Sequence, residues 1–152
     1  MKKRNSRGKS GSKIVSILLL LAFLGGAGYI YTAPEFEREK PQIEGSDNVF
    51  WNRKDPLIVK LKDNVGLSSY ELVLSDGDKS IIIGQGPFPN KTKEQTLLVK
   101  YPKSKVLDPK AKHFTLKIKV NDSSFWNMME GNSATKILKI NVDYKRPNVN
   151  IL

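Results

Sequence analysis

The sequence contains no cysteine and only one histidine, His113, among its 152 residues. Without cysteine the chain can form neither a disulfide nor a thiolate metal site. A catalytic zinc site needs about three protein ligands, commonly histidines with a carboxylate, and a single histidine does not supply them. The G-x-S-x-G motif of serine hydrolases is also missing. We therefore expect no enzyme activity, no metal and no cofactor, and we interpret His113 as an exposed residue where a loop meets a strand.

Acidic residues are absent before Glu35, whereas six of the 26 basic residues lie in the first 13 positions. This leaves 20 basic and all 15 acidic residues for the rest of the chain, a net charge of +5 out of the total of +11. A basic protein can bind nucleic acid. Here, however, about half of the excess charge is confined to one terminal segment, so nucleic acid is not an expected partner.

Residues 14–31 read IVSILLLLAFLGGAGYIY, eighteen residues without a charge. As a helix they would extend about 27 Å at 1.5 Å per residue, close to the hydrocarbon thickness of a bilayer. The alternative is a cleaved secretory signal, but the apolar run continues beyond the small residues at 25–28. We favour an uncleaved transmembrane helix over residues 14–32, which contacts the lipid bilayer.

The basic residues before this helix predict its orientation. Cytoplasmic flanks of membrane spans carry the excess of lysine and arginine, so residues 1–13 are predicted to be a basic cytoplasmic tail. Tyr29 and Tyr31 then fall where an aromatic belt at the outer interface would lie. Residues 33–40 contain proline and alternating charges, and predict a stalk that holds the next unit away from the bilayer.

Apolar and polar residues alternate with a period of two in the next part of the chain, which is typical of β-strands with one buried face. The expected strands cover residues 49–51, 57–62, 70–74, 80–83, 96–101, 114–120 and 138–142. Turn residues separate them, including GQGPFPNK at 84–91 and WNMMEGN at 126–132. Seven short strands predict an all-β fold, an immunoglobulin-like antiparallel β-sandwich over residues 41–145. A small closed barrel is the alternative.

Several residues receive structural roles in this sandwich. Asp63 and Asp122 end alternating strands, and we expect them to accept backbone N–H groups of the following loops. Large aromatic residues are expected to fill the space between the sheets. These are Phe50, Trp51, Tyr70, Phe114, Phe125 and Trp126.

The polar positions of the alternating strands are rich in lysine. Such a face is commonly only solvated, but it could also bind an anionic polymer or protein. The candidate surface-binding residues are Lys60, Lys62, Lys117, Lys119 and Lys139. They carry the hypothesis of a self-contained periplasmic binding protein that recognises peptidoglycan or another envelope protein.

The basic start, the single span, the segment FEREKPQI and the run VFWNRKDPLIVKLKDNVGLSSYELVLSDG resemble the N-terminal region of membrane-anchored, lysostaphin-type zinc murein endopeptidases. The closing YKRPNVNIL is similar to the passage from their first immunoglobulin-like domain into a second. The H-x-x-x-D and H-x-H elements that hold zinc in that family do not occur in this sequence. No catalytic residue is therefore carried over.

This resemblance implies a location and a role. The chain would be a single-pass protein of the bacterial inner membrane, with the C-terminal domain in the periplasm. It would serve as a non-catalytic spacer or docking domain in cell-wall remodelling, and residues 146–152 would be a linker or the start of a missing second domain. The oligomeric state is not indicated by these patterns.

Overall fold

The computed structural model describes residues 9–143. It begins with the helix α1 (Lys9–Thr32), whose segment Gly11–Thr32 is long and apolar enough to span a membrane. Its 22 residues would extend about 33 Å. Most of the predicted basic tail and the predicted linker at 146–152 lie outside the described residues.

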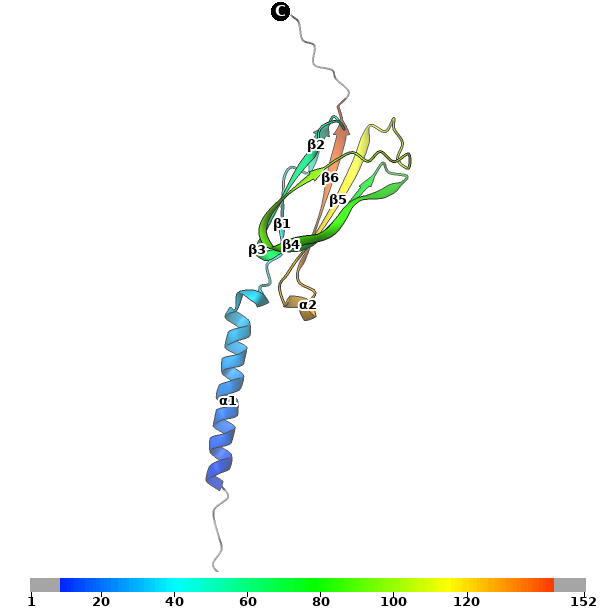
Figure 1. Cartoon of the computed structure of the whole chain (residues 1–152). Helices are drawn as coiled ribbons and strands as arrows, with labels where there is room; N and C mark the ends of the chain where they lie inside the picture. The colour runs from blue at the N-terminus through cyan, green and yellow to red at the C-terminus, as the bar shows by residue number, and fades with distance from the viewer. Residues whose placement is uncertain (1–8, 144–152) are drawn as a thin grey trace, which may run out of the picture.

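The rest of the chain forms a β body at one end of this helix (Figure 1). A short 3-10 turn, η1 (Pro34–Phe36), connects the two parts. The body contains β1 (Gln42–Glu44), β2 (Asn48–Trp51), β3 (Leu57–Ser75), β4 (Ser80–Val99), β5 (His113–Asp122), the single turn α2 (Trp126–Met129) and β6 (Ser133–Val142). The predicted β class with one N-terminal apolar helix is confirmed.

The strands form one six-stranded sheet in the order β1-β3-β5-β6-β2, with β4 paired to β3. Neighbouring strands are antiparallel except β2 and β6, which run parallel. The prediction that the strands pair antiparallel is therefore wrong for this one pair. The sheet is mixed and curled into a half-barrel. The sequence could not indicate this arrangement, because alternation of apolar and polar residues shows which face of a strand is buried and not which strand lies beside it.

The strands β3 and β4 are longer than predicted because they continue through two expected turns. Residues 57–62 of β3 pair with β1 and with the end of β4, whereas residues 69–75 pair with β5 and with the start of β4. The register shifts between Lys62 and Leu67, where the strand bends. Asp63 Oδ2 accepts the N–H groups of Val65 at 3.0 Å and Gly66 at 2.6 Å. The prediction that Asp63 accepts backbone N–H groups is confirmed, but Asp63 does not end a strand, because it lies within β3.

The core lies on the concave side of the curled sheet. Its most deeply buried side chains come from both halves of the curl, including Val59 and Leu61 from β3 and Leu116 and Ile118 from β5. Burial of this shared apolar surface is the main term that stabilises the body.

The aromatic predictions are confirmed only in part. Trp51 and Phe114 are buried, and the indole N–H of Trp51 donates to the carbonyl of Asp55 at 2.7 Å. Phe50 is 77% exposed because it precedes Trp51 on the same strand and therefore points to the opposite face. Phe125 is 45% exposed, and Phe88, which lies within a predicted turn, is buried instead.

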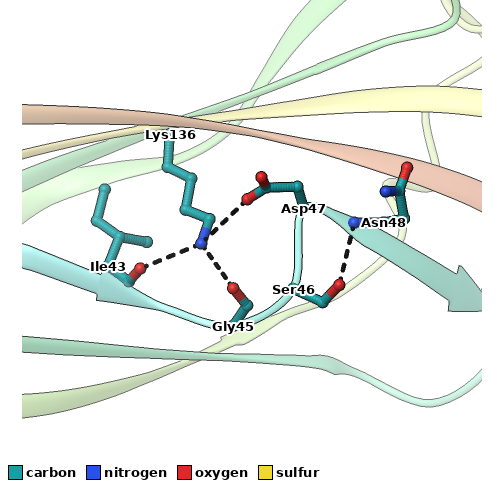
Figure 2. A network of polar contacts seen from close by, with 6 residues as sticks. All are labelled: Ile43, Gly45, Ser46, Asp47, Asn48 and Lys136. Atoms are coloured by element: carbon teal, nitrogen blue, oxygen red, sulfur yellow. Dashed lines mark hydrogen bonds and ion pairs between the residues drawn. The ribbon is translucent and has the colours of Figure 1, made fainter.

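Lys136 of β6 fixes the connection between β1 and β2. Its ammonium donates to the carbonyls of Gly45 at 2.6 Å and Ile43 at 3.4 Å, and lies 3.3 Å from a carboxylate oxygen of Asp47 (Figure 2). Gly45 has φ +123°, which favours glycine. The Lys136 side chain thus contacts three residues in and beside the segment that connects β1 with β2.

We expect the substitution Lys136→Met to destabilise the body by about 1–2 kcal/mol, because a charged hydrogen-bond donor is lost while the apolar stem is kept. Urea unfolding of the full chain in detergent, followed by circular dichroism, measures this. The matched control is Lys139→Met, at an exposed position of the same strand. Equal stability of both variants would contradict the proposed role of Lys136.

Candidate functional site

The segment predicted to be a stalk is bonded to the β body. The backbone N–H of Phe125 donates to the carbonyl of Glu35 at 2.5 Å, and the amide nitrogen of Asn132 donates to the carbonyl of Glu37 at 2.9 Å. Residues 33–40 therefore lie against the loop between β5 and β6. We call this contact, between residues 29–38 and residues 122–132, the helix–body junction.

A buried polar cluster organises the junction. Asp122, Ser124 and Asn132 are at most 5% exposed. Asp122 Oδ1 accepts the N–H groups of Ser124 at 3.0 Å and Asn132 at 2.7 Å and the hydroxyl of Ser124 at 2.8 Å, while its Oδ2 accepts the amide of Asn132 at 2.8 Å. The predicted role of Asp122 as a loop cap is confirmed, and the cap extends across the whole β5–β6 loop.

Gly131 is required beside this cluster. It has φ +77°, and a Cβ atom at this position would lie 2.5 Å from the Asp122 carboxylate oxygen. Side chains rarely adopt this conformation and real Cβ atoms do not approach an oxygen so closely. The loop therefore closes on Asp122 only with glycine at position 131.

Aromatic contacts connect the cluster to the end of α1. The ring of Phe36 packs edge-on against Tyr29 of α1, with centroids 6.4 Å apart, and against Phe125 of the β5–β6 loop, with centroids 5.8 Å apart. The Arg38 guanidinium lies 4.4 Å from the centroid of the Trp126 ring and 5.8 Å from that of Tyr31. These edge-on and cation-π geometries are attractive, so the helix and the β body are joined by side-chain contacts as well as by the chain.

A second polar contact reinforces the junction at the bend of β3. The side-chain amide of Asn64 donates to Glu37 Oε1 and to Glu39 Oε2, each at 2.8 Å. The linker is thereby held both at the β5–β6 loop and at the bend of β3. Sequence reasoning missed this junction because its contacts join residues up to 95 positions apart, as in the bond from Asn132 to Glu37.

The backbone of α2 is unusual. Asn127, Met128 and Met129 have φ of 53°, 57° and 74°, in the left-handed region. This conformation costs about 1–2 kcal/mol for each non-glycine residue. It is held by the N–H of Gly131, which donates to the carbonyl of Trp126 at 3.0 Å. The side chains of Met128 and Met129 remain 97% and 80% exposed.

The structure does not bring the five candidate lysines together. Lys60 and Lys62 lie on β3, in the half of the curl that pairs with β1, whereas Lys117, Lys119 and Lys139 lie on β5 and β6. The inner faces of these two halves share one core, so the lysines point outward on opposite sides of the body.

Lys62 is engaged in ion pairs. Its ammonium lies 3.0 Å from Glu44 and 3.7 Å from Glu94. The hydrogen bond and charge of Glu44 raise the pKa of Lys62 above its ordinary value. Part of the charge on this half is therefore already neutralised, and the arrangement does not favour a single lysine-rich binding face.

Two further titratable groups, His113 and Asp76, take part in contacts within the fold. His113 is exposed at the first position of β5, with its Nδ1 2.8 Å from Asn141 Oδ1. Asp76 accepts the backbone N–H groups of Asp108 at 2.7 Å and Lys79 at 2.8 Å, which hold the pKa of its carboxyl below the ordinary value. Within residues 9–143, no group of three or more histidine, aspartate or glutamate side chains is placed to hold a metal ion.

No protein-family model and no curated protein matches the chain. Among solved structures, it is similar to the fusolin of Wiseana spp. entomopoxvirus spindles, with a TM-score of 0.43 and 12% sequence identity. The match covers 69% of this chain and 44% of the fusolin chain, so this chain matches less than half the length of that protein. A similarity at this level carries no inference about function.

We expect Asp122→Asn to destabilise the protein by about 2 kcal/mol or more, because an amide nitrogen would replace one acceptor oxygen and face the amide of Asn132. Urea unfolding of the full chain in detergent tests this. Asp78→Asn, at an exposed hairpin position, is the control and should stay within about 0.5 kcal/mol of the original protein. A loss for Asp122→Asn no larger than for the control would contradict the role given to the cluster.

Proposed function

We propose that this chain is a non-catalytic, single-pass envelope module whose β body acts as a spacer or docking domain on the periplasmic side of a bacterial inner membrane. The observation that carries the proposal is the direct attachment of a helix of membrane-spanning length to the β body through the helix–body junction. A body bonded to its anchor keeps a defined distance and orientation relative to the bilayer, which a flexible stalk would not provide.

The direction of the strands supports the spacer role. The β5–β6 loop lies at the junction, and β6 leads away from it to the opposite end of the body (Figure 1). A partner or a further module placed after β6 would therefore be held at the membrane-distal end. The resemblance of the sequence to the N-terminal region of murein endopeptidases supports cell-wall remodelling as the process in which such a module takes part.

We also infer that the half-barrel is a variant of the immunoglobulin-like sandwich. The two halves of β3 pair with different partners, β1 on one side of the bend and β5 on the other. Each half thus contributes to a separate layer around one core. In this interpretation, the long β3–β4 hairpin joins two layers that are separate sheets in the usual sandwich.

The absence of cysteine makes a topology test direct, because a single introduced cysteine is the only thiol in the chain. We expect a membrane-impermeant maleimide to label Lys105→Cys, in the β4–β5 loop, when cells with a permeabilised outer membrane are treated. Ser6→Cys should react only after the inner membrane is broken, and Leu19→Cys only after detergent is added. Labelling of Leu19→Cys without detergent, or of a soluble cleaved form, would contradict the anchored arrangement.

A further inference from the structure

Two methionines of α2 project from the helix–body junction without contributing to the core. Met128 and Met129 are 97% and 80% exposed, whereas the preceding Phe125 and Trp126 contact Phe36 and Arg38 of the linker. The loop is thus fixed at its base by two aromatic residues, and its tip presents two large apolar side chains to the surroundings.

The position of this loop is set by the chain of ring contacts. Phe125 packs on Phe36, and Phe36 packs on Tyr29 in the last turns of α1. Figure 1 shows α2 at the end of the β body that faces α1, close to η1. The loop therefore lies at the level at which a membrane-spanning α1 would leave the bilayer.

The composition of the loop fits the interfacial region of a lipid bilayer. Tryptophan and tyrosine concentrate at this depth because their rings are apolar with one polar group, and Tyr31, Arg38 and Trp126 stack here. Methionine is flexible and adapts to irregular apolar surroundings. The segment FWNMM at 125–129 contains no lysine or arginine, so attraction to anionic lipid headgroups is not the basis of such a contact.

We propose that Met128 and Met129 insert into the outer interfacial region of the bilayer that α1 spans, and that the β body thereby has a second attachment to the membrane. The proposal rests on the proposed function, because it requires α1 to be embedded. Continuity with the anchor favours lipid as the occupant of this surface. Two attachment points would restrict rotation of the helix and the body together relative to the plane of the bilayer.

The experiment uses the full chain in phosphatidylcholine bilayers, with an environment-sensitive fluorophore on a single introduced cysteine. Three positions are compared: Met128→Cys, Leu19→Cys within α1, and Lys105→Cys in the loop at the other end of β5. We expect lipids with a nitroxide near the headgroup to quench the Met128→Cys label severalfold more than the Lys105→Cys label. Lipids with a nitroxide deep in the acyl chain should quench the Leu19→Cys label most.

A matched pair of variants tests the apolar basis of the contact. In the labelled Met128→Cys protein, Met129→Asp should reduce the shallow quenching to the level of the Lys105→Cys label, because a carboxylate is costly to bring into the interface. Met129→Leu, which keeps the apolar side chain, should retain the quenching. Raised ionic strength should leave the quenching unchanged, since the loop carries no basic residue.

The outcomes separate this inference from the proposed function. Deep quenching of the Leu19→Cys label together with background quenching at Met128→Cys would overturn the inference and leave the anchor intact. Absence of quenching at Leu19→Cys would overturn the proposed function and this inference with it. A Met128→Cys label that is shielded from water but not quenched by either lipid would place the loop against protein, such as a second copy of the chain, and would also overturn the inference.

Discussion

The pairing of the β3–β4 hairpin holds the rest of the body in place. β4 pairs along one side of β3, whereas the other side of β3 pairs with β1 at residues 60–62 and with β5 at residues 67–75. The register shift between Lys62 and Leu67 separates the two halves, and side chains from both halves share one core. Only residues 45–47 separate β1 from β2, which pairs with β6, and Lys136 bonds this connecting segment from β6. The β1–β2 connection thereby ties the two halves of the curl together.

The polar cluster at the C-terminal end of β5 performs a comparable task between the body and the helix. Asp122 ends β5, closes the β5–β6 loop and, through Asn132, reaches the carbonyl of Glu37 in the linker. Apolar contacts tolerate sliding, whereas buried hydrogen bonds are directional and are costly to leave unmade. The position of the linker on the β body therefore depends on this cluster, whereas the ring of Phe36 extends the contact to Tyr29 of α1.

The sequence predicted the local features better than the pairings. The alternation at residues 114–120 located β5, and the apolar run located α1. The aspartates that follow alternating runs were correctly predicted to accept backbone N–H groups, although only Asp122 ends a strand and Asp63 lies within β3. The parallel pairing of β2 with β6 and the split of the lysines between two sides were not predictable. Alternation assigns a residue to a face of its own strand, but the position of that face in the molecule follows from contacts between segments distant in the chain.

The left-handed backbone of α2 shows how these levels combine. Three consecutive non-glycine residues in this region cost about 1–2 kcal/mol each. The bonds around Asp122 and Gly131 hold the ends of the loop and so maintain the conformation. In water it keeps two methionines exposed, which is unfavourable, since full burial of such a side chain contributes about 1.5–3 kcal/mol. Contact of these two side chains with an apolar environment beside the helix–body junction would therefore offset part of this backbone cost.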